Sequence, residues 1–213
     1  MTESMRKIKR FKISTRQKEI TRKVLRLGLD LPAAQLNGEI ELAAFVLELA
    51  CKLDPGTVYE FNENALWDLG DQAVAAQGMF SACAVTLGQN VTDYADTLPP
   101  AKQLIAQTVL FEFLRTAVLF VADLIKEQAE KEECEALEPQ FVYVPKLGLA
   151  PEPKLFKDSP RTEEETARKI LPKLLERLQS GKIDVSCQDG SVRPQATAVF
   201  IVPWQKKKRR GKK

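Results

Sequence analysis

The feature that most constrains the fold is one long apolar segment, which follows Pro99-Pro100 and extends to about residue 133. Its most apolar part, TVLFEFLRTAVLFVADLI, is interrupted by Glu112, Arg115 and Asp123, which is typical of a buried helix and not of a membrane span. We therefore expect a helix over about residues 101–133 at the centre of the core. The apolar residues that keep near-3.6 spacing along it are Leu104, Ile105, Val109, Phe113, Ala117, Phe120, Val121 and Leu124.

Shorter helical patterns lie on both sides of this segment. A helix is predicted over residues 14–28, because Ser14 or Thr15 can cap it and Gly28 ends it. A second covers residues 37–53, and the alanine-rich residues 62–88 indicate one or two helical runs. The last starts at Ser159-Pro160 and ends near Gly181, with Pro172 inside it.

Period-two alternation marks four short strands: Val58 to Phe61, Phe141 to Val144, Ile183 to Cys187, and Ala196 to Val202. The last two are expected to form a hairpin through a turn at Asp189-Gly190, with Ile183 and Val185 pointing into the core and Ser186 outward. Val199 and Ile201 should face the core from the partner strand. The whole pattern predicts an α+β fold, in which helices pack around a small antiparallel sheet.

Charge is distributed unevenly along the 213 residues, although the net charge is only +3. Residues 1–26 contain ten Lys/Arg and two Glu, and the last eight residues contain seven Lys/Arg. Residues 27–205 therefore hold 15 basic and 27 acidic residues, a net charge of −12. We expect a basic arm over residues 1–13, one domain over residues 14–204 and a basic tail over residues 205–213. Such ends either bind nucleic acid or an acidic protein, or act as solvated tails.

The chain has no histidine and four scattered cysteines, Cys51, Cys83, Cys134 and Cys187. The missing histidine excludes Ser-His-Asp, Cys-His and histidine-ligated metal chemistry. A zinc site would need all four thiolates from distant segments, so we expect buried free thiols, with Cys51 and Cys83 in the core. No glycine-rich phosphate loop is present. The N-terminus has no apolar signal region, which leads us to expect a cytoplasmic location and no membrane association.

Five segments follow one another in a recognisable order: LDPGTVYEF, SACAVTLGQNV, the long helix from Ala101, RKILPKLLERLQSGKIDVSCQDG and RPQATAVFIV. This order resembles the activation domain of cobalamin-dependent methionine synthase, which binds S-adenosylmethionine, and its stand-alone relatives. The resemblance covers about residues 24–202, and its C-terminal part is the most specific. The resemblance implies the activation-domain fold, with a ligand-binding loop in front of the last helix.

The sequence departs from the family at the ligand contacts. The family's loop carries Arg-x-x-Pro-Gly-Tyr, in which the arginine holds the ligand carboxylate. Counting back from LPKLL places Lys154 at the arginine and Lys157, Asp158 and Ser159 at Pro-Gly-Tyr. The acidic residue that contacts S-adenosylmethionine from the family's long helix falls on Val118. The resemblance therefore supports the fold more than it supports binding of S-adenosylmethionine.

Five residues are the candidates for ligand binding: Tyr143, Lys154, Lys157, Asp158 and Arg161. Each has a structural alternative, since the cations can be solvated loop residues, Asp158 can cap the next helix, and Tyr143 can lie on an edge strand. Two further features stay open before the structure is known. Glu112 and Arg115, three residues apart, either pair along the helix or point into a cleft. Trp67 is expected in the core, and Trp204, beside the basic tail, is a candidate for an exposed stacking residue.

Two functions follow. The first, implied by the resemblance, is an activation-domain-like accessory protein for a cobalamin-dependent methyltransferase. This accessory protein would dock on the methyltransferase or present a ligand to it during reductive reactivation. The cobalamin would belong to a partner, because this chain has no histidine to ligate cobalt. The second is a non-catalytic binding module whose basic ends contact nucleic acid or an acidic protein. No set of residues in the sequence by itself indicates an enzyme.

Overall fold

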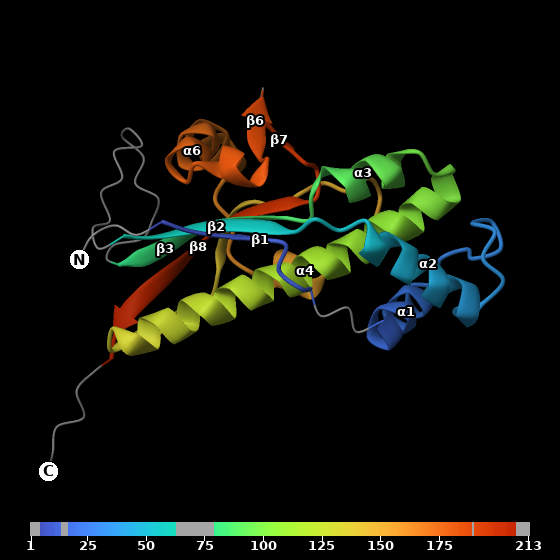
Figure 1. The fold of residues 1–213 in the computed structure, drawn as a ribbon, viewed down its shortest axis with the longest axis horizontal. Coiled ribbons are helices and arrows are strands. Elements are labelled where there is room, and N and C mark those ends of the chain that lie inside the picture. The colour runs from blue at the N-terminus through green and yellow to red at the C-terminus, as the bar shows by residue number, and fades with distance from the viewer. Residues whose placement is uncertain (1–4, 14–16, 63–78, 189, 208–213) are drawn as a thin grey trace, which may run out of the picture.

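The long apolar segment forms helix α4 (Pro100–Lys131), with Pro100 in its first turn. A computed structural model describes residues 5–13, 17–62, 79–188 and 190–207. In it, α4 runs along one face of a six-stranded sheet (Figure 1). By length and composition α4 could cross a membrane, but 67% of its most apolar window is buried inside the protein. The prediction of a central core helix is confirmed.

The sheet is antiparallel and is built around the last strand of the chain. The order is β1-β2-β3-β8-β4, and β5 pairs with β8 beside β4. The strands are β1 (Arg6–Lys9), β2 (Gly56–Asn62), β3 (Phe80–Thr86), β4 (Cys134–Ala136), β5 (Gln140–Tyr143) and β8 (Thr197–Lys206). Because β8 lies between β3 and the outer strands β4 and β5, its residues Thr197–Val202 are buried on both faces of the sheet.

Helices cover both faces of this sheet, which confirms the predicted α+β fold (Figure 1). On one face, α4 packs with α1 (Gln17–Arg26), α2 (Glu39–Cys51) and α3 (Gln89–Asp96). On the other face lie α6 (Glu164–Arg177), the 3-10 turn η1 (Ser180–Ile183), and the hairpin of β6 (Ser186–Gln188) and β7 (Ser191–Arg193). Two hydrophobic cores result, since alternate residues of β8 point to opposite faces: Phe200 toward α4, and Val199 and Ile201 toward α6.

Part of the predicted basic arm belongs to the sheet. Strand β1 pairs with β2, and the side chains of Phe11 and Ile13 are buried in the α4-side core. The sequence showed no sign of this strand, because its lysines and arginines masked the alternation. The tail boundary also shifts, since Gln205 and Lys206 pair with β4.

One strand was predicted as helix. Residues 80–86 (FSACAVT) form β3, and every side chain in it is buried. A strand that is buried on both faces shows no period of two, and its small residues Ala82 and Ala84 resemble helix formers. Residues 63–78, which include Trp67, lie outside the described residues, as do Ser14 and Thr15.

The predicted C-terminal hairpin is wrong in its pairing and right in its buried faces. Residues 180–183 form a 3-10 turn, β6 pairs with β7 instead of β8, and β8 pairs with β3. Ile183 and Val185 are nevertheless buried in the α6-side core, together with Val199 and Ile201, and Ser186 is exposed. Ile183 and Val185 are buried although the pairing differs from the prediction, because the β6–β7 hairpin folds over the α6 side of the sheet (Figure 1).

Packing decides the positions of three side chains that the sequence left open or for which it gave an expectation. Glu112 accepts hydrogen bonds from Arg115 Nε (2.9 Å) and Lys23 Nζ (2.7 Å), so the intrahelical pair forms and also ties α1 to α4. Trp204 is buried against Phe61, with ring centroids 4.3 Å apart, and so is not an exposed stacking residue. Cys51 is exposed at the end of α2, because it lies off the face that buries Leu42, Phe45, Val46 and Leu49.

Candidate functional site

The best-formed hollow near the predicted ligand loop is a groove on the α6 side of the sheet. It encloses about 850 Å³ between the outer strand β5, the first half of α6 and the hairpin β6–β7. This size lies in the range of small-molecule sites, ~300–1,000 Å³. Its polar and charged lining residues are Tyr143, Lys146, Arg161, Thr162, Glu164, Arg168, Ser191, Arg193 and Gln195, and we call it the β5–α6 groove.

Strand β5 positions Tyr143 at the floor of this groove. A register shift between Phe141 and Tyr143 interrupts the regular pairing with β8, and bulges of this kind redirect side chains. Burial raises the pKa of the Tyr143 phenol above its ordinary value. The backbone of Val192 and the charge of Arg193 act in the opposite direction, so both lie close to the phenol. Tyr143 therefore stays neutral near pH 7 and can donate one hydrogen bond to a ligand.

Among the described residues, four cations and one carboxylate line the groove, and two of the cations already form ion pairs or hydrogen bonds. Arg161 donates to the carbonyl oxygen of Phe156 from Nε (3.0 Å) and Nη2 (2.6 Å), and pairs with Glu152. Arg168 pairs with Glu164 at 2.7 Å. Lys146 and Arg193 form no ion pair within the described residues. Positive charge is thus left available at two points of the groove.

Of the five predicted ligand residues, the structure brings two together in the groove, Tyr143 and Arg161. Lys154, Lys157 and Asp158 lie on the short helix α5 (Lys154–Asp158), are exposed and do not line the groove.

Helix α5 is held in place by the buried Phe156. Its ring centroid lies 5.2 Å from that of Phe141 and 6.0 Å from that of Phe111. Because this anchor faces inward, Lys154 and Lys157 on the same short turn face solvent.

Val118 also takes no part in the groove. It is fully buried in the core between α4 and the sheet, whereas the groove lies on the α6 side. The position at which the activation-domain family has an acidic ligand contact is therefore filled by core packing in this protein.

Sequence reasoning missed Lys146 and Arg193, which carry the groove's available charge. Both stand beside a proline, in Pro145-Lys146 and Arg193-Pro194; Arg193 ends β7, and Lys146 lies in the loop after β5. Charged residues in rigid loop positions are a recognisable signal for binding sites, but the pattern is weak without knowing which loops converge.

Within the described ranges, no group of three or more His, Cys, Asp or Glu is arranged to hold a metal ion. Cys83 is fully buried and burial raises the pKa of its thiol, which keeps it protonated and unreactive at neutral pH.

Comparison with known proteins identified no relative of this chain: a scan against protein-family models and a search of curated proteins both found no match. The functional argument therefore depends on the groove and the charged surfaces of the fold itself.

Proposed function

We propose that this protein is a non-catalytic accessory protein for a cobalamin-dependent methyltransferase, and that its β5–α6 groove holds a small ligand through the ligand's carboxylate or phosphate group. The observation that carries the proposal is the groove itself, with a neutral phenol and two cations that form no ion pair within the described residues. The segments that frame it include RKILPKLLERLQSGKIDVSCQDG and RPQATAVFIV, on which the resemblance to the activation domain is strongest. Cobalamin would be supplied by the partner, and this chain would orient the ligand.

The charge of the groove restricts its ligand. Four cations against one carboxylate give the lining a net positive charge, which favours carboxylate or phosphate groups. S-Adenosylmethionine carries a positive sulfonium beside its amino-acid carboxylate, whereas S-adenosylhomocysteine lacks the sulfonium charge. We therefore expect S-adenosylmethionine to bind weakly or not at all, and S-adenosylhomocysteine to bind more tightly.

Thermal-shift and calorimetric titrations with both compounds test the ligand part of this proposal, because a ligand that binds the folded state raises its stability. Arg193→Gln and Lys146→Gln should abolish the shift, and Lys173→Gln, an exposed position on α6 outside the groove, should leave it unchanged. Micromolar or tighter binding of S-adenosylmethionine would contradict the charge argument. If neither compound gave a groove-dependent shift, the ligand-holding role would be wrong.

The partner part has a separate test. Size-exclusion chromatography of the protein mixed with a cobalamin-loaded methionine synthase that lacks its own activation domain should show co-migration, followed by the absorbance of the cobalamin. Migration of the two proteins as separate peaks at tens of micromolar would remove the methyltransferase from the proposal, although a ligand site could remain.

A second candidate function, a binding module that contacts nucleic acid through its basic ends, is favoured by one observation. Arg6, Lys7 and Lys9 are exposed on the edge strand β1, and Lys206 and Lys207 are exposed at the end of β8. Titration of a labelled DNA duplex separates the candidates, because backbone binding would weaken steeply with salt and would not depend on Arg193.

A further inference from the structure

A basic stripe runs along the outer face of α1. Lys18, Arg22 and Arg26 follow one another at intervals of four residues, which places them about 6 Å apart along the helix axis. All three are exposed, and within the described residues none forms an ion pair. They line a hollow together with Gln17, Glu19 and Lys23.

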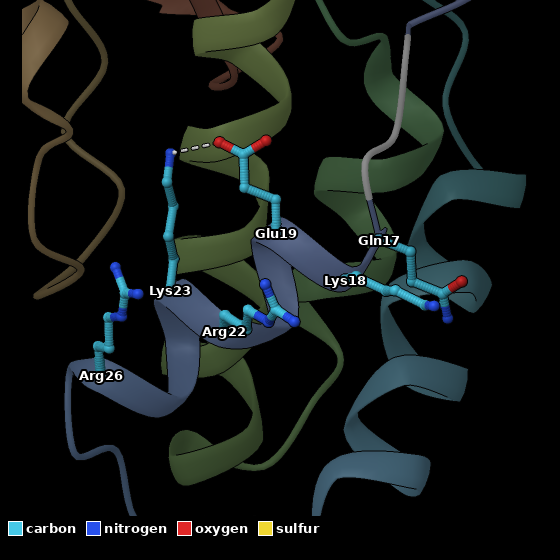
Figure 2. Close-up of a pocket in the computed structure, with 6 residues that line it drawn as sticks. All are labelled: Gln17, Lys18, Glu19, Arg22, Lys23 and Arg26. Carbon is cyan, nitrogen blue, oxygen red and sulfur yellow. Dashed lines mark ion pairs between the residues drawn. The ribbon is translucent and has the colours of Figure 1, made fainter.

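The ion pairs of α1 with described carboxylates lie on one side of the helix, at Lys23. Lys23 pairs with Glu112 at 2.7 Å and lies 3.7 Å from Glu19. Figure 2 shows the Lys23 and Glu19 side chains directed toward each other, whereas the Lys18 side chain points away from this pair. The stripe is therefore distinct from the ion pairs that fasten α1 to α4.

Local helix energetics account for Arg26 only, because the helix dipole favours a cation in the last turn. Like charges four residues apart destabilise a helix, and the dipole disfavours a cation in the first turn, where Lys18 lies. The solvent face of α6 is built differently: Arg168 pairs with Glu164 at 2.7 Å and Lys169 with Glu165 at 2.8 Å. The same chain therefore neutralises one exposed helix face and leaves another positively charged.

The composition of the stripe favours a protein partner over nucleic acid. Leu25 is 39% exposed and lies three residues after Arg22 and seven after Lys18, so it belongs to the same face of α1. An exposed leucine gains nothing from a phosphate backbone but can be buried by an apolar side chain of a protein. No aromatic residue lines the hollow for stacking on bases.

We propose that the outer face of α1 (Lys18, Arg22, Leu25 and Arg26) is a docking surface for an acidic amphipathic helix of a partner protein. Glutamates at four-residue intervals on such a helix match the spacing of the three cations, and arginine can pair with a carboxylate at two points. A leucine beside those glutamates covers Leu25. The surface lies on the α4 side of the sheet, so docking there leaves the β5–α6 groove accessible.

A synthetic helical peptide tests this docking surface. The probe is a fluorescein-labelled peptide with glutamate at every fourth position and leucines beside that stripe, and its binding is followed by fluorescence anisotropy. The triple variant Lys18→Gln/Arg22→Gln/Arg26→Gln should weaken binding about tenfold or more, since each exposed ion pair contributes modestly. Leu25→Ser should weaken peptide binding separately. The melting temperature of the triple variant should stay the same or rise, because like-charge repulsion is removed.

The control is a second triple variant, Lys154→Gln/Lys157→Gln/Lys173→Gln, which removes the same charge from exposed positions on α5 and α6. It should bind the peptide as the unmodified protein does. An equal loss of peptide binding in both triple variants would show that net charge alone explains the binding, and would overturn the proposal. Failure of the peptide to bind would also overturn it, as would α1-dependent binding of a DNA duplex or of vesicles containing phosphatidylserine in place of the peptide.

Discussion

Replacing Val185 with aspartate is expected to test the C-terminal region most directly. Val185 is 2% exposed and lies in the α6-side core with Ile183 and Val192. Its backbone is fixed by Ser180, whose carbonyl accepts from the Val185 N–H at 3.1 Å and whose hydroxyl donates to the Val185 carbonyl at 2.9 Å. The side chain cannot turn outward without breaking these two bonds.

The expected cost has two contributions. Removing a buried valine loses about 1.5–3 kcal/mol of burial free energy. Placing an unpaired carboxyl among aliphatic side chains adds about 1–3 kcal/mol even after its pKa rises and it becomes neutral. The change Val185→Asp should therefore lower the free energy of unfolding by about 2.5–6 kcal/mol, a large part of the ~5–15 kcal/mol of an ordinary domain.

Urea unfolding, followed by circular dichroism, measures this change. Ser186→Asp is the matched control, because it introduces the same charge one residue away at an exposed position paired across the hairpin with Arg193. It should alter stability by no more than about 0.5 kcal/mol. If Ser186→Asp were the damaging change and Val185→Asp the mild one, the faces of this segment would be assigned the wrong way round. An equally large loss in both would indicate that charge, and not burial, decides the effect.

Three further outcomes are expected. Glu112→Gln removes the carboxylate that joins α1 to α4 and should lower the free energy of unfolding by about 1–2 kcal/mol, since Lys23 and Arg115 can be rehydrated. An unchanged midpoint of chemical denaturation would show that these two ion pairs contribute nothing to stability. Tyr94 donates a hydrogen bond to Glu48, which, with burial and the Glu48 charge, raises the pKa of Tyr94 to about 12. Stability from this pair is full below about pH 10 and lost as the pH rises toward 12, and Glu48→Gln should bring the phenol's ultraviolet titration back toward pH 10. Gly88 has a φ of +92°, and an added Cβ would lie 2.7 Å from the carbonyl oxygen of Asp54, so Gly88→Ala should lower the melting temperature by several degrees.

The sequence by itself determined the elements with strong, uninterrupted periodicity. The 3.6-residue spacing of α4 and the alternation from Val58 to Phe61 within β2 were readable because each is a continuous local pattern. The burial of Ile183 and Val185 was also readable, since apolar residues seek a core whichever strand lies beside them.

Strand pairing was decided only by the tertiary structure. Strand β3 is buried on both faces and so shows no alternation, and β8 pairs with β3, which is more than 100 residues earlier in the chain. No local pattern specifies such a partner, because the hydrogen bonds of a strand are the same for any neighbour.

The groove could be predicted only in part for the same reason, because local patterns do not specify which distant segments converge. Tyr143 and Arg161 could be selected from their loop, but Lys146 and Arg193 join them only because β5 and the β6–β7 hairpin lie on opposite sides of one hollow. Lys154 and Lys157 were excluded from it by the burial of Phe156, which turns α5 outward. Residue type and spacing indicate which side chains can bind an anion, and long-range packing selects the ones that converge.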